Sequence, residues 1–265
     1  MTIQARIISL DPKNSVALAL CQSLINEGID AELFSAVDGR ASFPDLLPGE
    51  KVCQNRSLLN RRTELTASEA GCYLSHYRLV KHAYENQLSH ICIFEDDVIA
   101  EPGLGEVIRS ICALDSDAHM VRLMSLKLRK RKLVQPLTAD HQLARPVRGA
   151  LGTQGYVLNR QGMKKILIAG ANISMPIDKF YDSFFLFGFN CFYVEPHVIY
   201  EMDSDSTVTK RYTQLDKRLW VTLGWRLNKL YRSLRRKFYY LARRKDFTPA
   251  KKPPQDIGKS RRLRL

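Results

Sequence analysis

The sequence predicts an α/β fold with a mixed, mostly parallel sheet, in one domain that carries a C-terminal appendage. Residues 5–10 and 31–37 have the apolar composition of short buried strands, and residues 16–25 have the spacing of a helix that ends near Gly28. A strand, a helix and a strand within about 35 residues form a βαβ unit, whose strands are parallel. The chain of 265 residues is long enough to bury the core of such a domain.

Further along the chain, apolar runs and capping residues predict more strands and helices. A capping box of Thr66 and Glu69 starts a helix that ends near Asn86. The other expected elements are, in chain order, strands at 91–94 and 120–124, a helix that Asn159 caps and Gly170 ends, and a strand at 191–195. By contrast, prolines, glycines and polar or basic residues predict loops at residues 40–63 and 128–146.

The charge of the chain is concentrated at its C-terminal end. The formal net charge is +14, and residues 206–265 hold 19 Lys and Arg against three acidic residues, so the preceding part is close to neutral. This asymmetry predicts an acidic partner for the segment, either nucleic acid or an anionic membrane. No helix-turn-helix, zinc or RNA-binding pattern accompanies the charge, and we expect no nucleic-acid partner.

Within this basic segment, apolar residues recur at helical spacing. They are Leu219, Leu223, Leu227, Leu230, Leu234, Phe238 and Leu241, with Trp220 and Trp225 beside them. Such a basic amphipathic helix lies in a membrane interface with its apolar side down, and each basic residue near an anionic leaflet contributes about 1 kcal/mol. We therefore expect residues 215–245 to bind an anionic membrane surface. The alternative is a helix packed on the domain with a solvated charged face.

These patterns divide the chain into three parts. Residues 1–205 form the α/β domain, residues 206–248 a basic helical extension, and residues 249–265 a basic tail that we expect to be disordered. No signal peptide is evident, and no stretch approaches the roughly 20 apolar residues of a membrane span. The six cysteines lack the close spacing of zinc or redox motifs, so we expect them to be reduced and the protein to be cytoplasmic.

Glu95, Asp96 and Asp97 directly follow the apolar run at residues 91–94. In open α/β sheets, ligands collect beyond the carboxyl ends of the strands. Carboxylates crowded there need a cation or must take up protons, and their oxygens suit Mg²⁺ or Mn²⁺. Such an ion neutralises the charge of a departing diphosphate. An acidic surface turn after a strand is the alternative, because a run of three acids is a short pattern.

Seven segments between residues 7 and 205 occur as an ordered set. They are residues 7–11 (IISLD), 34–39 (FSAVDG), 65–76 (LTASEAGCYLSH), 93–98 (IFEDDV), 152–157 (GTQGYV), 176–178 (PID) and 195–196 (EP). In this order the set resembles glycosyltransferase family 25, the bacterial lipooligosaccharide galactosyltransferases and their relatives. The resemblance implies a GT-A-like fold with a single nucleotide-sugar-binding domain. It also implies a divalent metal, Mn²⁺ or Mg²⁺, and inverting transfer of a hexose, usually galactose from UDP-galactose.

The resemblance also implies partners and a place in the cell. The partners are a UDP-sugar donor and a lipid-linked oligosaccharide acceptor, such as a lipooligosaccharide or lipopolysaccharide core. The expected location is cytoplasmic, peripheral on the inner face of the bacterial inner membrane. A non-catalytic membrane- or nucleic-acid-binding adaptor with a glycosyltransferase-like body is the alternative function.

Residue roles follow from the same resemblance. Asp97 is the expected metal ligand, Glu95 a second ligand or a ribose contact, and Asp96 a residue that orients its neighbours. Asp178 is the expected general base on the acceptor hydroxyl, and Asp182, four residues later, is its rival. Structural use of either aspartate, as a cap or in an ion pair, is the alternative.

Other residues are expected to border the donor. They are Ser9 and Leu10 beside the uridine, Asp38 near the nucleotide, Ser75 and His76 at the diphosphate or sugar, and Gly152 and Gly155 where the backbone approaches the ligand. A satisfied structural histidine and an ordinary turn are the alternatives for His76 and the glycines. His197 is a minor candidate for a further metal ligand.

The sequence departs from the family pattern in places, including Ala67, which stands where the family often has proline at the helix start. Family members often follow the first strand with Asp and two arginines, whereas this chain has Asp11-Pro-Lys-Asn, so Lys13, Arg61 or Arg62 would have to hold the phosphate. Glu201 falls near a position often occupied by Gln, which leaves the donor specificity open.

Overall fold

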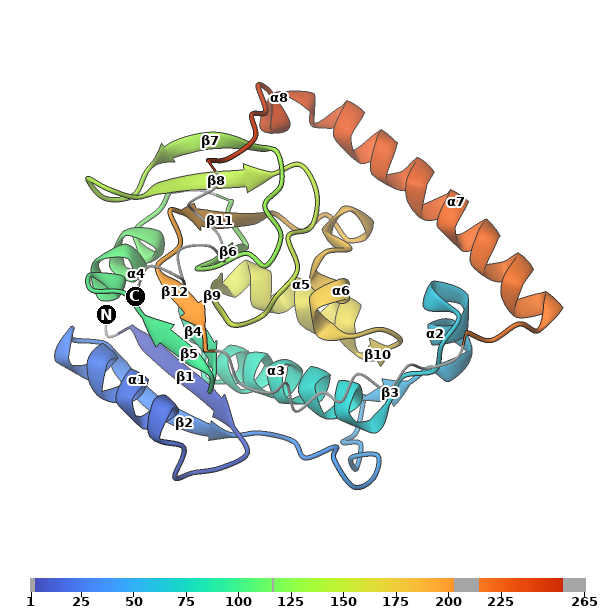
Figure 1. The fold of residues 1–265 in the computed structure, drawn as a ribbon, viewed down its shortest axis with the longest axis horizontal. Helices are drawn as coiled ribbons and strands as arrows, with labels where there is room; N and C mark the ends of the chain where they lie inside the picture. Colours follow the sequence, from blue (N-terminus) through green and yellow to red (C-terminus); the bar gives the residue numbers. More distant parts are fainter. Residues whose placement is uncertain (1–2, 116, 203–214, 255–265) are drawn as a thin grey trace.

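The computed structural model describes residues 3–115, 117–202 and 215–254. Its centre is an eight-stranded sheet with the order β2-β1-β4-β9-β6-β11-β8-β7 (Figure 1). These strands are β1 (Gln4–Ser9), β2 (Asp30–Ser35), β4 (His90–Glu95), β6 (Met120–Arg122), β7 (Arg131–Pro136), β8 (Gln142–Pro146), β9 (Gly155–Asn159) and β11 (Cys191–Glu195). Six of the eight strands run in one direction, and β9 and β8 run in the other. The predicted mixed, mostly parallel sheet is confirmed.

Helices cover both faces of this sheet. They are α1 (Ser15–Asn26), α2 (Gln54–Arg61), α3 (Ala67–Glu85), α4 (Leu104–Cys112), α5 (Arg160–Gly170), α6 (Ile177–Tyr181), α7 (Leu219–Ala242) and α8 (Arg244–Phe247), with a 3₁₀ turn η1 (Phe184–Leu186). One apolar cluster joins α1 and α4 to the sheet, and a second joins α3, α5 and α6 to it. Ile7 belongs to the first cluster and Ile8 to the second, because successive side chains of a strand point to opposite faces.

Two small sheets connect distant parts of the chain. β3 (Lys51–Val52) pairs with β10 (Asn172–Ile173), and β5 (Val98–Ala100) pairs with β12 (Ile199–Glu201). The second pair places Glu201 opposite Val98, the residue that follows the run of three acids. A late part of the chain therefore returns to the acidic segment.

The two predicted loops contain regular structure. Residues 40–63 include β3 and α2, and residues 128–146 form the β7–β8 hairpin at the end of the sheet. The prolines that suggested a loop, Pro136 and Pro146, are the last residues of β7 and β8, where a missing N–H costs little. The loop prediction holds for residues 40–50 but is wrong for residues 51–61 and for the hairpin. β3 and β8 form because they pair with the remote strands β10 and β11.

Local signals placed α1 and α3 correctly, whereas α2 and α4 were not predicted. Asn14 caps α1 by accepting hydrogen bonds from the N–H groups of Val16 and Ala17 at 3.0 and 3.1 Å. The predicted capping box is present at the start of α3, with Thr66 and Glu69 bonded reciprocally. These caps satisfy backbone donors that the first turn of a helix leaves open.

The basic helix α7 packs along one side of the domain (Figure 1). The Asn228 amide donates to the carbonyl of Leu59 at 3.0 Å, and the ring of Tyr239 lies 5.8 Å from that of Phe184. No helix among the described residues combines the length and the hydropathy that crossing a membrane requires. After α8, the backbone of Lys251 exchanges two hydrogen bonds of 2.9 Å with Arg131 of β7. The remainder of the predicted disordered tail, residues 255–265, lies outside the described residues.

Candidate active site

The parallel strands β1 and β4 bring their carboxyl ends to one edge of the sheet. Ile8 lies opposite Glu95 in the ladder, so Ser9 is beside the acidic run. The Ser9 hydroxyl donates to Asp96 Oδ2 at 2.6 Å. This bond fixes the carboxylate of Asp96 and uses the Ser9 hydroxyl that we expected to face uridine.

Glu95 is held from two sides. Its Oε1 accepts a hydrogen bond from the Thr153 hydroxyl and lies 3.4 Å from His76 Nε2, which belongs to α3. Burial acts to raise the pKa of Glu95, but the interactions with His76 and Thr153 outweigh it and lower the pKa below its usual value. Glu95 is therefore an oriented, ionised carboxylate.

His76 is buried at the centre of a chain of side-chain hydrogen bonds. Its Nδ1 is 2.8 Å from the Tyr156 hydroxyl, which is 3.0 Å from the hydroxyl of Tyr181. A neutral imidazole satisfies both contacts when Nδ1 accepts from Tyr156 and Nε2 donates to Glu95. The histidine thus positions Glu95, and its own orientation is fixed by two buried tyrosines.

Cys72 joins this group one turn before His76 on α3. The ligand atoms of Cys72, His76 and Glu95 all lie within 4.8 Å of one another. The residue was missed in the sequence, although the spacing of four between Cys72 and His76 places both on one helix face. Burial, followed by the negative charges of Glu95 and Asp178, raises the pKa of the Cys72 thiol. A protonated thiol is a poor metal ligand.

Asp97 is the most electrostatically unfavourable carboxylate of the edge. Its Oδ1 is buried and has no hydrogen-bond partner among the described residues. Burial and the negative charges of Glu95, Glu201 and Asp96 raise the pKa of Asp97 to about 7. The backbone carbonyl of Asp97 accepts a 2.7 Å hydrogen bond from the N–H of Met202, next to Glu201. The Glu201 contribution was not expected and depends on the pairing of β5 with β12.

This arrangement fits a divalent cation. A buried oxygen without a partner, surrounded by carboxylates, is stabilised by a positive ion. Asp97 and Glu95 are the residues that would hold the ion, with Asp96 and Glu201 adding negative charge nearby. The available ligands are carboxylate oxygens, which favour Mg²⁺ or Mn²⁺ over softer metals.

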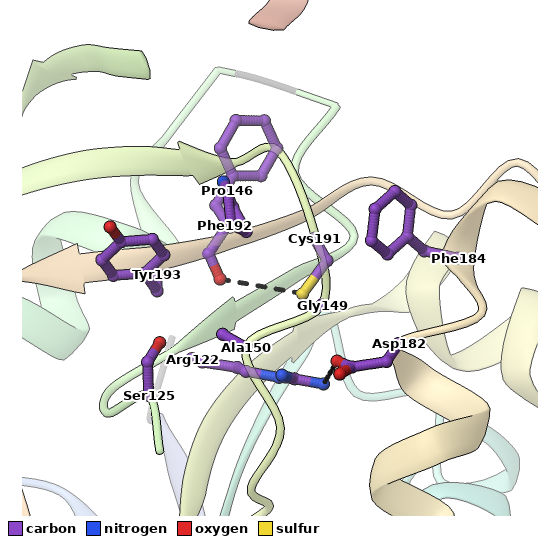
Figure 2. Close-up of a pocket in the computed structure, with 10 residues that line it drawn as sticks. All are labelled: Arg122, Ser125, Pro146, Gly149, Ala150, Asp182, Phe184, Cys191, Phe192 and Tyr193. Carbon is purple, nitrogen blue, oxygen red and sulfur yellow. Dashed lines mark hydrogen bonds and ion pairs between the residues drawn. The ribbon is translucent and has the colours of Figure 1, made fainter. Parts of the chain in front are cut away.

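The two candidate bases have different environments. Asp182 Oδ1 lies 2.9 Å from Arg122 Nη2, and its Oδ2 accepts from the N–H of Leu151 at 3.1 Å. Figure 2 shows this ion pair beside Gly149, where an added Cβ would come within 2.2 Å of Asp182 Oδ2. Asp182 is therefore used to hold the loop at 149–151.

Asp178 is freer to react. Its Oδ1 accepts from the N–H of Lys179 at 2.7 Å, and burial, as the largest effect, raises the pKa of its carboxyl. The negative charge of Asp178 also contributes to the raised pKa of the Cys72 thiol. A raised pKa suits a general base.

Several residues expected at the donor have other contacts. The buried Ser75 hydroxyl accepts from the N–H of Val37 and donates to the carbonyl of Gly71, both at 2.8 Å. Gly155 is inside the sheet, where an added Cβ would lie 2.4 Å from Ile199 Cδ1. Asp38 is exposed and pairs with Arg40 at 2.7 Å. These contacts are structural.

The remaining donor-side residues are placed as follows. Leu10 directly follows β1 and is exposed. Gly152 has φ +84°, and an added Cβ there would lie 2.3 Å from Gln154 Oε1. His197 is buried, with its ring 6.3 Å from that of Tyr193.

The residues considered for phosphate differ in availability. Arg61 binds both carboxylate oxygens of Glu69 at 2.8 Å, and Arg62 donates to the carbonyl of Asp216 at 3.0 Å. Lys13 follows β1 with an exposed side chain. Of these three cations, Lys13 is the one at the carboxyl edge of the sheet.

Two glycines bring α3 close to this edge. An added Cβ on Gly39 would lie 2.1 Å from the carbonyl oxygen of Ala67, and one on Gly71 would lie 2.7 Å from that of Val37. The segment after β2 therefore crosses the start of α3 at a distance that only glycine allows. This crossing positions the helix face that carries His76.

Comparison with known proteins identifies the family. The model of glycosyltransferase family 25 (LPS biosynthesis protein) matches residues 3–181. The chain belongs to this family, as its ordered motifs indicated.

Two relatives illustrate the range of the family. The lipooligosaccharide biosynthesis protein lic2B of Haemophilus influenzae is 28% identical over 152 residues, which is 53% of each protein. The human procollagen galactosyltransferase 2 is 26% identical over 170 residues, 61% of this chain and 27% of the human protein. The chain spans about a quarter of the length of the animal relatives that it matches.

A solved structure is also similar to this fold. It is a Drosophila galactosyltransferase 7 mutant in complex with manganese, UDP-Gal and xylobiose, with a TM-score of 0.41 and 9% identity. The match covers 81% of this chain and 76% of that one.

Proposed function

We propose that this chain is a metal-dependent, inverting glycosyltransferase that moves galactose from UDP-galactose to a glycan acceptor. The observation that carries the proposal is the half-buried Asp97, whose buried Oδ1 has no hydrogen-bond partner among the described residues and whose pKa is raised by burial and by the charges of three other acids. A structural acidic turn would not retain such a group at an electrostatic cost. Family membership adds the reaction class.

The protein's own residues prepare the donor side. Asp97 and Glu95 would hold the cation, which on binding supplies positive charge to the diphosphate leaving group. The Tyr181–Tyr156–His76 chain fixes Glu95, and Ser9 fixes Asp96. Because these contacts exist before any ligand binds, little reorganisation is needed when the donor binds.

On the acceptor side, Asp178 acts as the general base. In a single displacement it takes the proton of the acceptor hydroxyl while the hydroxyl oxygen bonds to the anomeric carbon and the bond to UDP breaks. The Arg122–Asp182 pair stabilises the neighbouring loop, which we assign a supporting role. The raised pKa of Asp178 supports this division of work.

The galactose and the acceptor are inferred from relatives. One relative takes part in lipooligosaccharide biosynthesis and another is a procollagen galactosyltransferase, by their names. We propose a lipid-linked lipooligosaccharide or lipopolysaccharide core as the acceptor, reached from the cytoplasmic face of the bacterial inner membrane.

A donor screen tests this function. The purified chain is incubated with Mn²⁺ or Mg²⁺ and a panel of nucleotide sugars, and released UDP is measured. We expect release from UDP-galactose that stops when the metal is chelated. Turnover of another sugar nucleotide would change the donor, whereas no turnover and no UDP-dependent rise in melting temperature would favour the non-catalytic adaptor.

A further inference from the structure

Helix α7 has one face that docks on the domain. Val221 is buried, the Asn228 amide bonds to Leu59 and Asn60, and Tyr239 packs on Phe184 of η1. At about 100° per residue, Val221, Asn228 and Tyr239 fall on the same side of the helix. This face holds α7 against α2 and η1.

The opposite face is apolar and exposed. Its residues, which we call the leucine stripe, are Leu219, Leu223, Leu227, Leu230, Leu234, Phe238 and Leu241. Each is between 45% and 74% exposed, and no described residue covers the stripe. The same helical geometry places the stripe about 160° to 260° from Val221. Helix α7 has 24 residues and extends about 36 Å along the molecule, as Figure 1 illustrates.

An uncovered stripe of this length requires an occupant. Soluble proteins rarely expose contiguous apolar surface of this extent without an interaction partner. The domain itself is excluded as the occupant, because the other face of α7 already makes those contacts. The structure thus packs α7 on the domain, as the alternative expects, but through the face of Val221, Asn228 and Tyr239, and it leaves the apolar stripe exposed.

The charge around the stripe selects the partner. Exposed Arg226 and Lys237 lie along one border, Lys229 lies beyond that border and Arg235 beyond the other, and α7 contains no acidic residue. A second copy of the helix would bring these positive charges together. A nucleic acid would neutralise them but leave the leucines in water. A surface with anionic groups above hydrocarbon satisfies both features.

We propose that the leucine stripe docks on a lipid bilayer that contains anionic headgroups, with α7 lying parallel to the surface. Trp220, half exposed at one border of the stripe, takes the interfacial position that suits indole rings. This inference depends on the exposed surface of α7 and does not require the proposed reaction.

Docking also orients the proposed acceptor site. The Arg232 guanidinium donates to the Ser183 hydroxyl at 2.5 Å, and Ser183 lies between α6, which carries Asp178, and η1. The membrane-facing helix is thus joined by direct contacts to the segment that carries the proposed base. A lipid-linked acceptor would meet this segment from the docked side.

Vesicle flotation of the full chain tests the proposal without donor or acceptor. We compare phosphatidylcholine vesicles with vesicles that also contain phosphatidylglycerol. The test variant combines Leu227→Ser, Leu230→Ser and Leu234→Ser, and the control is Ile168→Ser, which changes a residue of α5 that is 73% exposed. Because the changed side chains are solvent-exposed, we expect the variants to fold like the wild type.

We expect the wild type and the control to float with anionic vesicles, and the triple variant to bind at least about tenfold more weakly. The fluorescence of Trp220, isolated by Trp225→Phe, should shift to the blue on binding. Equal binding to neutral vesicles would overturn the requirement for anionic lipid. A wild type that does not float would overturn the proposal.

Two other results would then identify a different partner. If the wild type dimerises and the triple variant does not, the stripe binds a second copy of the chain. If the wild type binds an oligonucleotide, the basic border binds nucleic acid.

Discussion

Glu95 and His76 meet at 3.4 Å between Oε1 and Nε2, although one ends β4 and the other lies in the middle of α3. Through His76, this contact joins Glu95, a proposed metal ligand, to the hydrogen-bonded hydroxyls of the buried Tyr156 and Tyr181. The carboxylate that we propose as a metal ligand is thereby held in one orientation by the histidine ring. The histidine acts as a positioning residue for Glu95 and is the first residue to test.

We predict that His76→Leu lowers the metal affinity and the transfer rate by about 10- to 100-fold, the range found when partners of metal ligands are removed. His76→Gln, whose amide can still donate toward Glu95, should lose less. Mn²⁺ titration of UDP release measures the effect, with the melting temperature as a check on folding. Equal losses in the two variants would mean that the histidine serves packing alone.

Asp97 should show opposite effects on stability and on activity. In the metal-free protein, Asp97→Asn removes an unfavourable buried charge, so we expect a higher melting temperature at pH 8. The same change should remove Mn²⁺-dependent stabilisation and turnover. Thermal melts with and without Mn²⁺ measure this, and Asp140→Asn, on an exposed turn, is the matched control. A fully active Asp97→Asn enzyme would contradict the assignment.

Local signals in the sequence were sufficient to predict several elements in the first half of the chain, namely β1, α1, β2, α3 and β4. The apolar run of β4 and the capping box of α3 are encoded by adjacent residues, and both were predicted. The β7–β8 hairpin was missed because its exposed edge strand has no alternating apolar pattern, and its place depends on the pairing of β8 with β11. Long-range pairing does not leave a local pattern.

In the candidate site, too, contacts between residues close in sequence could be predicted, whereas contacts that depend on long-range pairing could not. Glu95 and Asp97 are neighbours in sequence, so their proximity could be predicted from the run itself. Glu201 joins them through the three-residue pair β5–β12, which no composition signal marks. Ser75 carries a family motif, yet its hydroxyl is used to hold the segment after β2, a role that only the packing of α3 reveals.

Replacing each candidate base by Asn in a separate variant should distinguish a catalytic role from a role in folding stability. Asp178→Asn is expected to lower the transfer rate by about 10²- to 10⁴-fold, the range for loss of a general base, with an unchanged melting temperature. Asp182→Asn leaves Arg122 buried without its partner and should cost about 3–5 kcal/mol of folding free energy. Initial rates and urea unfolding of both variants distinguish the roles. A stable, inactive Asp182→Asn protein would make Asp182 the base.

His119 predicts how stability depends on pH at a distance from the site. Its side chain is buried, and its Nδ1 accepts a 2.8 Å hydrogen bond from the N–H of Asn190, which requires an unprotonated nitrogen. The pKa of His119 is lowered to about 4, mainly by burial. The positive charges of Lys165, Arg243 and Arg145 lower it further, and the negative charge of Asp117 opposes them. The unfolded histidine binds a proton near pH 6.5, so the unfolded state holds more protons between these values. Stability from this group is therefore complete above about pH 6.5 and is lost as the pH falls toward 4.

Urea unfolding at pH 7 and pH 5 measures this effect. The wild type should lose more folding free energy between the two pH values than His119→Gln, which has no titrating ring. His90→Gln is the control, because burial also lowers the pKa of His90, whereas its Nδ1 contacts the Ser89 hydroxyl at 3.4 Å and not a buried backbone N–H. If His119→Gln keeps the whole pH dependence of the wild type, the lost stability comes from other groups, and the buried hydrogen bond to Asn190 does not control it.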